Sequence, residues 1–288
     1  MKEQIFVLNN YENFEPKHIF ECGQCFRWNK EDDESYTGIF KNNVLNVKKE
    51  GKRITFKGMC EEGIIKTITK YFDLDKNYGN IKKELSNLDE NMKKAVEYGH
   101  GIRILNQDFW ECIISFIISA NNHILRIKKI IERISKQYGN EIKWQGNTYY
   151  TFPTPEQLSN ATIEDFRAMG VGFRDKRLYE TVQKVLKKEI NLEYIENLND
   201  CKKIKEELLK IDGVGDKVAN CVMLFSLQKF EVFPVDVWVR RVMNELYIKN
   251  EDETKVDKKE IEKLAEGKYG ENAGIAQQYL FYWKREEK

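Results

Sequence analysis

The amino-acid sequence predicts an α+β fold, in which a small antiparallel β-sheet domain precedes a mostly α-helical body. The prediction rests on two observations. Residues 1 to about 75 contain short apolar and β-branched stretches separated by hairpin loops. From Asn80 onward, apolar residues recur at helical spacing with little interruption. We therefore expect a sheet domain over residues 1–100 and a helical domain over residues 101–288.

Three strands are expected in the N-terminal part, at residues 35–40, 44–47 and 53–56. Each is rich in β-branched or aromatic residues, which favour strands. The stretches between them, 41–43 and 50–52, contain asparagine or glycine beside charged residues, which is typical of hairpin loops. Strands joined by such short loops pair antiparallel, so we expect one small sheet.

The helical body is expected to consist of helices joined by loops. Pro153 and Pro155 mark one such loop, because proline interrupts a helix. The most apolar stretch, 109–120, is too short to span a bilayer and contains Glu111, so we expect a buried helix there and no membrane segment. The predicted helices cover residues 108–119, 124–138, 161–169, 176–188, 202–211, 216–227, 237–246, 258–269 and 273–283.

Composition limits the class of protein. The 288 residues suffice for one large core or two smaller ones. The formal net charge is +1, so a surface that binds nucleic acid must be a local basic face. Among six cysteines, Cys22 and Cys25 form a lone C-x-x-C, which is a poor zinc site without a second pair. No secretory segment is evident, and we expect reduced thiols and an intracellular protein.

Residues 208–221 predict the end of one helix, a tight Gly-Val-Gly turn and the start of a second helix. Gly213 and Gly215 permit positive φ and the close approach of another backbone. Free N–H groups at the start of the second helix bind phosphate, so this unit can grip DNA without reading its sequence. A helical turn with two glycines is also common in any α-protein. Lys217 lies in the first turn of the second helix, and Cys221 follows on the same face.

A second motif, residues 233–236, precedes the next helix. Pro234 holds the chain extended, and Asp236 is placed to cap the helix that follows. An isolated aspartate before a helix is usually only a cap. Because Asp236 follows the Lys217 helix closely, the two side chains could instead pair a nucleophilic amine with a carboxylate.

Residues 213–217 followed by residues 234–236 resemble the helix–hairpin–helix, Gly-Pro-Asp superfamily of DNA base-excision glycosylases. Five further stretches are similar to its 8-oxoguanine DNA glycosylase branch and occur in family order along nearly the whole chain. The resemblance implies a twisted N-terminal sheet packed on a helical glycosylase body, with the helix–hairpin–helix at about residues 203–227. The stretches are Gly23-Gln24-Cys25-Phe26-Arg27-Trp28, Gln107-Asp108-Phe109-Trp110-Glu111-Cys112, Ser119-Ala120-Asn121-Asn122, Gly170-Val171-Gly172-Phe173-Arg174 and Ala273-Gly274-Ile275-Ala276-Gln277.

The resemblance implies a catalytic pair. Lys217 matches the family's nucleophile, which attacks the sugar C1′ as a neutral amine and forms a Schiff base. Asp236 matches the carboxylate that stabilises the cationic, sugar-like transition state. The implied enzyme flips 8-oxoguanine out of duplex DNA, excises it and cleaves the strand by β-elimination as an AP lyase.

Base recognition is implied for four residues. Gly23 matches the residue whose backbone carbonyl accepts the N7–H that oxidised guanine has and guanine lacks. Phe281 would stack on the extruded base. Gln277 lies one helical turn before Phe281 and would reach the Watson–Crick edge. Cys221 matches the family's pocket cysteine.

Other residues are implied to hold the DNA where the base has left. Asn121 matches the residue that enters the vacated space, and Phe173 matches an aromatic wedge. Arg126 and Arg174 match the arginines that hydrogen-bond the orphaned cytosine, whose N3 and O2 are acceptors. The implied partner is double-stranded DNA that contains oxidised guanine opposite cytosine.

No cofactor is implied to be required. The family's hairpin can bind a monovalent or divalent cation through main-chain carbonyls, here around Leu209, Ile211 and Val214. No cysteine follows Cys221, so we expect no iron–sulfur cluster of the kind that endonuclease III relatives carry. Nothing in the sequence indicates a partner subunit, and we expect a monomer.

Three positions depart from the family pattern. Trp238 replaces a histidine that contacts phosphate, Lys284 replaces an assisting aspartate, and His123 replaces the third asparagine of a run. These changes put phosphate contacts and rate in question more than the type of reaction. The alternatives are a related glycosylase for another damaged base, and a non-catalytic helix–hairpin–helix DNA-binding protein.

Overall fold

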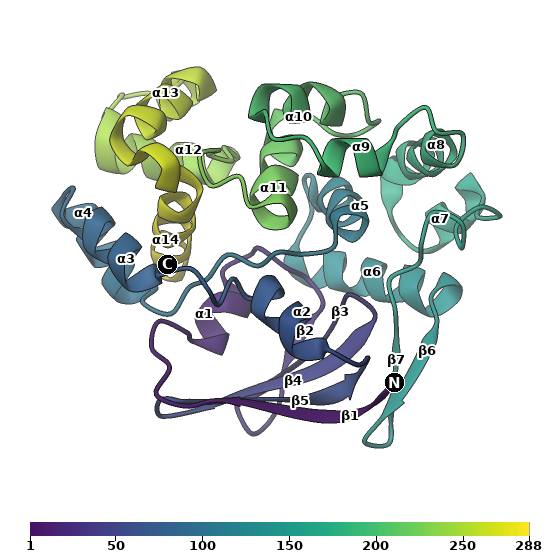
Figure 1. The fold of residues 1–288 in the computed structure, drawn as a ribbon. Coiled ribbons are helices and arrows are strands. Elements are labelled where there is room, and N and C mark those ends of the chain that lie inside the picture. The colour runs from purple at the N-terminus through teal and green to yellow at the C-terminus, as the bar shows by residue number, and fades with distance from the viewer. Residues whose placement is uncertain (288) are drawn as a thin grey trace.

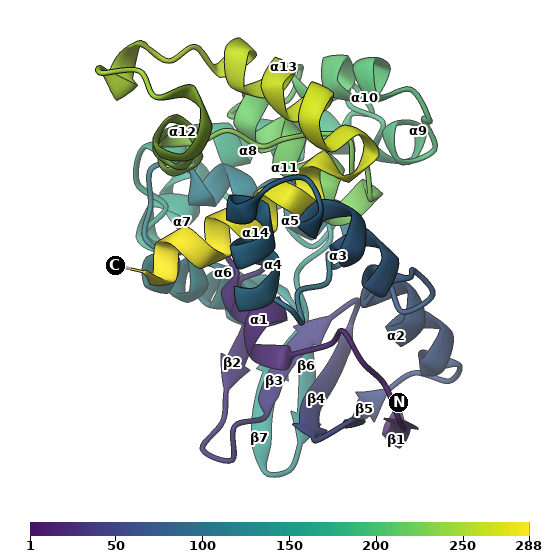
Figure 2. The same cartoon turned by 90° about the vertical axis from the view of Figure 1, so that its left-hand side faces the viewer.

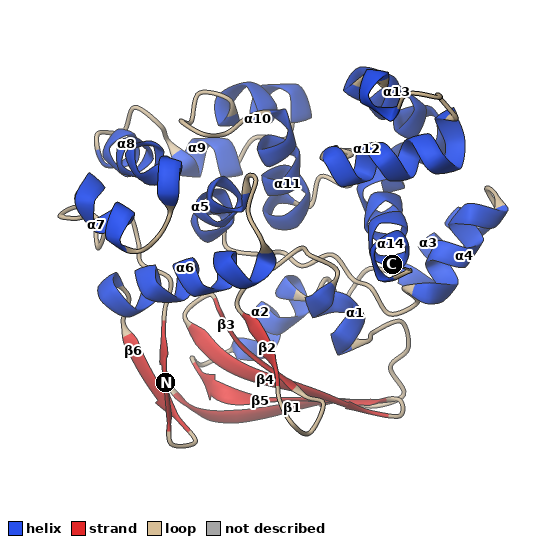
Figure 3. Cartoon of the chain, turned by 180° about the vertical axis from the view of Figure 1, so that it is seen from behind, coloured by secondary structure: helices blue, strands red, loops and turns tan. Residues whose placement is uncertain are grey.

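The computed structural model describes residues 1–287 and has a β-sheet at one end and most of its helices at the other (Figure 1). The five-stranded sheet is antiparallel, with the strand order β1-β5-β4-β3-β2, and a two-stranded hairpin, β6–β7, lies beside it (Figure 3). The predicted α+β class is confirmed. The strands are β1 (Lys2–Leu8), β2 (Trp28–Lys30), β3 (Tyr36–Phe40), β4 (Asn43–Glu50), β5 (Arg53–Cys60), β6 (Glu141–Trp144) and β7 (Asn147–Tyr150).

The helical body follows the predicted pattern closely. Helices cover residues 124–138, 216–227 and 258–269 with the expected bounds. The predicted helix 237–246 ends earlier, at Met243, and continues as a π-helical turn, η2 (Asn244–Ile248). The α-helices are α1 (Pro16–Glu21), α2 (Ile64–Tyr71), α3 (Tyr78–Ser86), α4 (Glu90–Tyr98), α5 (Phe109–Ser119), α6 (Ile124–Tyr138), α7 (Ile163–Ala168), α8 (Asp175–Leu186), α9 (Leu192–Glu196), α10 (Cys201–Leu208), α11 (Asp216–Leu227), α12 (Val237–Met243), α13 (Lys258–Tyr269) and α14 (Ala273–Glu286), with 3-10 turns η1 (Gly172–Arg174), η3 (Glu253–Lys255) and η4 (Gly270–Asn272).

The sequence prediction missed both edge strands of the sheet. β1 pairs with β5 along its whole length, from Lys2 opposite Cys60 to Leu8 opposite Ile54. An edge strand has only one partner, and the apolar run at the end of β1 shows no clean alternation, so its pattern is weak. β2 has three residues, which is too short to display any period.

The β6–β7 hairpin interrupts the part of the chain that was predicted to be helical. Gln145 and Gly146 both have positive φ, at 49° and 76°, which is the geometry of a tight hairpin turn. The Trp144 ring is buried in a small cluster that includes Ile39 of the sheet, and its indole N–H donates to Glu3 at 2.9 Å. The β6–β7 hairpin is therefore stabilised by packing against a distant strand, and local periodicity does not predict it.

Besides the small cluster around Trp144, two larger hydrophobic cores are present among the described residues. The smaller lies between the sheet and helices α1 and α2, where the Trp28 ring stacks on Phe20 with centroids 4.1 Å apart. The larger fills the helical body and includes side chains of α3 and α4. Helix α14 packs along α4, as Figure 2 shows, so the C-terminal helix returns to the N-terminal part of the chain.

Arg103 ties the segment between α4 and α5 to the sheet side. Its side chain is 1% exposed, and its guanidinium lies 4.2 Å from the centroid of the Tyr78 ring. A buried charge is tolerated only when its donors are satisfied. The guanidinium donates to the backbone carbonyls of Asn13, Phe72, Asp73 and Lys76.

Replacing Arg103 with methionine should lower the free energy of unfolding by roughly 3 kcal/mol, because several buried carbonyls lose their donor at once. Methionine fills much of the same volume, so lost packing contributes less. Urea unfolding followed by circular dichroism measures the change. The same substitution at Arg53, which is exposed, should shift stability by no more than about 0.5 kcal/mol. Equal destabilisation by both variants would contradict this assignment.

Candidate active site

Lys217 and Asp236 line the same space in the structure. Both contribute to a narrow slot and to a wider groove next to it, so the amine and the carboxylate stand where the two cavities meet. The walls of the slot include Gly23, Cys221, Gln277 and Phe281. The walls of the groove include Asn121, Gly213, Gly215 and Trp238.

The hairpin positions Lys217. It ends with Gly215 as the N-cap of α11, so Lys217 falls in the first helical turn, where backbone N–H groups lack helical partners. The ammonium lies 5.2 Å from the centroid of the Phe116 ring. The neighbouring Asp216 pairs with Lys205 at 3.0 Å. Among residues 1–287 no carboxylate pairs with Lys217, so the amine is not held in a salt bridge beside the slot.

Asp236 begins α12 and caps it. Its Oδ1 accepts a hydrogen bond from the Val239 N–H at 2.7 Å, as the sequence predicted for an N-cap. Pro234 and Val235 before it are buried and fix the direction of the chain. The carboxylate is only partly buried and also lines the slot, so one side chain can cap the helix and face the cavity together.

Cys221 lies one helical turn after Lys217 and is 3% exposed. Burial raises the pKa of its thiol, while the positive charge of Lys217 lowers it and the negative charge of Asp236 raises it. Nucleophilic cysteines have lowered pKa values. The Cys221 thiol is therefore a neutral wall of the slot and is not activated as a nucleophile.

Gly23 faces Phe281 across the slot. Its φ is +86°, a backbone conformation that side chains other than glycine rarely adopt. A Cβ atom at this position would lie 3.1 Å from Cε1 of Phe281, so the phenyl ring would have to move. No hydrogen bond among the described residues ends on the Gly23 carbonyl, which therefore remains available as an acceptor.

Gln24 fixes the turn that contains Gly23. Its side chain is fully buried. The amide donates to the carbonyls of Ile19 at 2.9 Å and Arg103 at 2.8 Å, and its oxygen accepts from the Leu105 N–H at 2.8 Å. These bonds join α1 to the segment before α5. The position of the Gly23 carbonyl is therefore set by a satisfied buried network.

Gln277 and Phe281 stand on one face of α14, four residues apart. Gln277 is 4% exposed, and its Oε1 accepts from Nε2 of Gln278 at 2.7 Å. This bond orients the Gln277 amide and leaves its NH₂ group as a donor toward the slot. Gln278 lines the slot too and was not predicted from the sequence.

The residues predicted for the opposite strand cluster at one end of α6. Asn121 has a left-handed φ of +50° just before this helix, and Phe173 is 60% exposed. Arg174 is buried and donates to the carbonyls of Ala120 and Asn121, so it braces the Asn121 turn. Arg126 is exposed and donates to the Gly170 carbonyl at 3.1 Å.

Arg177 is a candidate that the sequence analysis missed. Its guanidinium lies 5.6 Å from the centroid of the Phe173 ring, and its Cδ would be 3.1 Å from a Cβ atom on Gly213. Arg177 thus connects the exposed wedge to the hairpin. Its spacing of three from Arg174 on the same helical face could have revealed it. Burial lowers the pKa of Arg174, and the positive charges of Arg126 and Arg177 nearby lower it further.

The hairpin differs from the prediction in one detail. Gly213 has φ +88°, as expected, but Gly215 has φ −101° and so does not use the left-handed region. A Cβ atom on Gly215 would meet nothing within 4 Å, whereas one on Gly213 would lie 3.2 Å from Ile117. Gly213 is therefore needed for the turn, and Gly215 keeps the surface open to a close neighbour.

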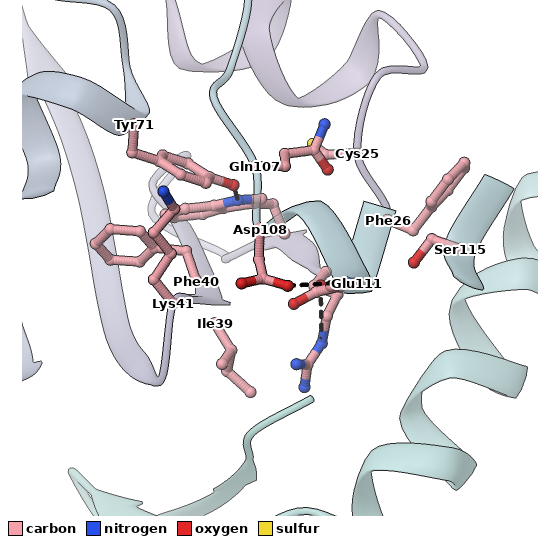
Figure 4. Close-up of a pocket in the computed structure, with 12 residues that line it drawn as sticks. Cys25, Phe26, Ile39, Phe40, Lys41, Tyr71, Gln107, Asp108, Glu111 and Ser115 are labelled. Carbon is pink, nitrogen blue, oxygen red and sulfur yellow. Dashed lines mark hydrogen bonds and ion pairs between the residues drawn. The ribbon is translucent and has the colours of Figure 1, made fainter. Parts of the chain in front are cut away.

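A third cavity lies between the sheet and α5, and Lys217 does not line it (Figure 4). Arg27 lies 4.0 Å from Glu111, and Asp108 accepts from the Glu111 N–H at 2.9 Å. Burial raises the pKa of Glu111 to about 7, while Arg27 lowers it. The family-like stretch at 107–112 thus connects the start of α5 to Arg27, the residue before β2.

The three departures from the family pattern lie in different surroundings. Lys284 pairs with Glu245 and with Glu287, at 2.7 Å each, so its charge is engaged away from Phe281. His123 is the N-cap residue of α6 without a side-chain bond to it. Trp238 lines the groove and cannot repeat the ionic contact of a histidine.

Within residues 1–287, no three side chains of His, Cys, Asp or Glu converge to hold a metal ion. All six cysteines are free thiols. None of the helices in this part of the chain has the length and apolar character needed to cross a bilayer.

Comparison with known families divides the chain into two matches. Residues 6–113 match the family described as "8-oxoguanine DNA glycosylase, N-terminal domain". Residues 114–268 match "HhH-GPD superfamily base excision DNA repair protein", where HhH-GPD denotes the helix–hairpin–helix and Gly-Pro-Asp motifs.

Individual proteins agree with these matches. The chain is 33% identical over 258 residues to the N-glycosylase/DNA lyase of Saccharomyces cerevisiae, covering 80% of this chain and 67% of the yeast protein. It is 33% identical to a relative in Methanothermobacter thermautotrophicus named "Probable N-glycosylase/DNA lyase", covering 67% of this chain and 66% of that protein. It thus spans about two thirds of both. A solved structure of Clostridium acetobutylicum 8-oxoguanine glycosylase/lyase, bound to double-stranded DNA with cytosine opposite 8-oxoguanine, superimposes with a TM-score of 0.93 at 45% identity, covering 99% and 97% of the two chains.

Proposed function

The chain belongs to the 8-oxoguanine DNA glycosylase family of the HhH-GPD superfamily of base excision repair proteins, and from this premise we propose that it is a bifunctional DNA glycosylase and AP lyase. It flips 8-oxoguanine out of duplex DNA, excises it through a Schiff base, and cleaves the strand by β-elimination. The observation that supports this most is the meeting of Lys217 and Asp236 beside the slot between Gly23 and Phe281.

In the proposed reaction, the Lys217 nitrogen forms a bond to C1′ while the bond from C1′ to the base nitrogen breaks, and the electron pair leaves with the base. The sugar carries positive charge as these bonds change. The Asp236 carboxylate stabilises that charge, and its cap bond to Val239 holds it in place without neutralising it. The C1′–O4′ bond then breaks while the nitrogen lone pair forms C=N, and O4′ takes up the proton that the nitrogen gives up, which yields the Schiff base. Loss of the C2′ proton then breaks the C3′–O bond and expels the 3′ phosphate.

Recognition of the base is proposed to depend on the Gly23 carbonyl. Oxidised guanine donates from N7, whereas guanine presents an acceptor there. The carbonyl, which accepts no hydrogen bond from residues 1–287, would attract the first and repel the second. An acceptor facing an acceptor in a dry slot costs about 1–3 kcal/mol. Phe281 stacks on the base, Cys221 closes the other side, and Gln277 donates to the Watson–Crick edge.

The DNA backbone is proposed to lie along the groove. The hairpin of Gly213, Val214 and Gly215 presents N–H groups at the start of α11 to a phosphate. Asn121 and Phe173 enter the space that the base vacates. Arg126 and Arg174 donate hydrogen bonds to the orphaned cytosine. Arg174 is buried and bonded to the carbonyls of Ala120 and Asn121, whereas the Arg126 guanidinium is exposed.

Arg126→Ala should weaken the preference for cytosine opposite the lesion more than it slows excision opposite other bases. The exposed guanidinium can offer donors to cytosine N3 and O2, and loss of such a contact costs about 1–3 kcal/mol. Single-turnover rates opposite each of the four bases measure the effect. Arg133→Ala, two turns further along α6, is the matched control and should leave the preference intact. Equal losses opposite all four bases would contradict the role.

A panel of duplexes tests the proposed function as a whole. Wild-type protein should release 8-oxoguanine opposite cytosine and form an adduct that borohydride traps. A related glycosylase for another damaged base would form an adduct only with a different lesion. A non-catalytic binding protein would retain the duplex and form no adduct.

Further expectations belong to the same proposal. Within the described part of the chain, the Ile211 carbonyl accepts one hydrogen bond, from the Val214 N–H at 3.0 Å. It would keep a lone pair for a cation shared with the carbonyls of Leu209 and Val214. Catalysis needs no other cofactor and no iron–sulfur cluster. We also propose a boundary near residue 100 between the sheet and helical domains, action as a monomer, and a place of work inside the cell with its DNA substrate.

A further inference from the structure

Arg285 is the next residue on the face of α14 that carries Gln277 and Phe281. The three positions are four residues apart, so their side chains lie above one another along the helix. The first two line the slot directly. Arg285 does not line it, but lies behind the Phe281 ring, with its guanidinium carbon 5.4 Å from the ring centroid.

The same guanidinium reaches the opposite wall of the slot. Its Nη2 donates to the backbone carbonyl of Glu21, two residues before Gly23. Its Nη1 lies 3.3 Å from the point that a Cβ atom on Gly23 would occupy. One side chain therefore contacts both the turn that presents the Gly23 carbonyl and the ring that faces it across the slot.

The hydrogen bonds that the Arg285 guanidinium makes determine whether the Gly23 carbonyl stays free as an acceptor in the slot. Nη1 is buried and has no hydrogen-bond partner among residues 1–287, and the Gly23 carbonyl close by accepts no bond either. If the guanidinium turned to join these two groups, it would consume the acceptor that the base requires. Its bond to the Glu21 carbonyl, together with the pair to Glu286 at 3.1 Å, holds it in the orientation that keeps the acceptor free.

We propose that Arg285 is a positioning residue for base discrimination, which sets the separation of the Gly23 carbonyl and the Phe281 ring and keeps that carbonyl unpaired. The inference rests on the proposed function, since it concerns the fit of an oxidised purine. Arg285 acts through Gly23 and Phe281 and takes no part in bond formation at Lys217. An abasic substrate has no base to fit, so its cleavage does not depend on Arg285.

The experiment compares Arg285→Met with wild-type protein on two substrates. Methionine keeps an apolar side chain against Phe281 and removes every donor. Single-turnover excision of 8-oxoguanine opposite cytosine should fall about 100-fold, the effect expected of a reacting group held roughly 1 Å out of place. Borohydride trapping on a preformed abasic site opposite cytosine should stay at the wild-type level, as should affinity for the abasic duplex.

Two further variants make the result specific. Arg285→Lys retains one donor for the Glu21 carbonyl but lacks the planar group. Its excision rate should therefore lie between those of wild-type protein and Arg285→Met. If Arg285→Met does not fold, the excision rate of Arg285→Lys tests the positioning role in its place. Arg53→Met, the same substitution at an exposed position of the sheet, should leave both activities unchanged.

The remaining outcomes would overturn either the role of Arg285 or the proposed substrate. A parallel loss of excision and trapping, with a lower melting temperature, would make Arg285 a purely structural residue and overturn the inference. Excision at the wild-type rate by Arg285→Met would overturn it as well. Wild-type protein that cleaves the abasic duplex but releases no 8-oxoguanine would overturn the proposed substrate itself, and the inference with it.

Discussion

Lys217→Gln is expected to abolish both release of 8-oxoguanine and borohydride trapping of the enzyme–DNA adduct. An amide nitrogen is not nucleophilic and cannot form a Schiff base, so excision should fall by at least about 10⁴-fold. Glutamine keeps an unbranched, polar side chain beside Phe116, so the slot and the fold should survive. Single-turnover kinetics and gel analysis of reduced adducts measure the two losses separately.

The matched control is Lys210→Gln. Lys210 is an exposed lysine of the same hairpin, pairs with Glu207 at 2.6 Å, and lines neither cavity. Its substitution should leave excision and trapping near wild-type levels. An adduct that persisted in Lys217→Gln would mean that another amine attacks the sugar, and the mechanism would have to be rebuilt around that amine.

Asp236→Asn is expected to slow excision by about 10²–10³-fold, the usual cost of removing one preorganised charge-stabilising group. The substitution separates two roles of one side chain. Asparagine caps helices about as well as aspartate, so the bond from the Val239 N–H is kept while the negative charge is lost. Thermal stability should therefore change little although the chemistry slows.

Asp257 supplies the control for this variant, because it caps α13 through the Lys259 N–H at 3.0 Å and lines neither cavity. Asp257→Asn should affect neither stability nor excision. If Asp236→Asn excised 8-oxoguanine at the wild-type rate, Asp236 would be a helix cap alone. If it instead unfolded at much lower temperature, its rate would report on folding and not on the transition state.

Local patterns predicted the backbone geometry around Lys217 and Asp236, with the exception of φ at Gly215. The two glycines of the hairpin, Lys217 one turn into a helix, and the extended Pro234 before a capping Asp236 are all features of short segments. Their geometry follows from φ preferences, capping and helical spacing, which neighbouring residues determine. The helix bounds at 124–138 and 216–227 were predictable for the same reason.

Contacts between distant segments were not predictable from such patterns. Arg177 reaches the hairpin because α8 packs beside it, and Arg285 reaches Glu21 because α14 returns to the start of the chain. The β6–β7 hairpin forms against a sheet strand about 100 residues earlier, where tertiary packing overrides local propensity. The family resemblance did not predict the contacts of these residues, which became visible only in the three-dimensional structure.

The return of α14 has a consequence for how the protein is made. Translation delivers the chain from its amino end, so Gly23 leaves the ribosome early, Lys217 and Asp236 much later, and α14 after both. A nascent polypeptide can therefore expose the Lys217 amine before the wall that carries Gln277 and Phe281 exists. Under the proposed function, the part of the slot that selects a damaged base is therefore completed only when α14 packs against the rest of the chain.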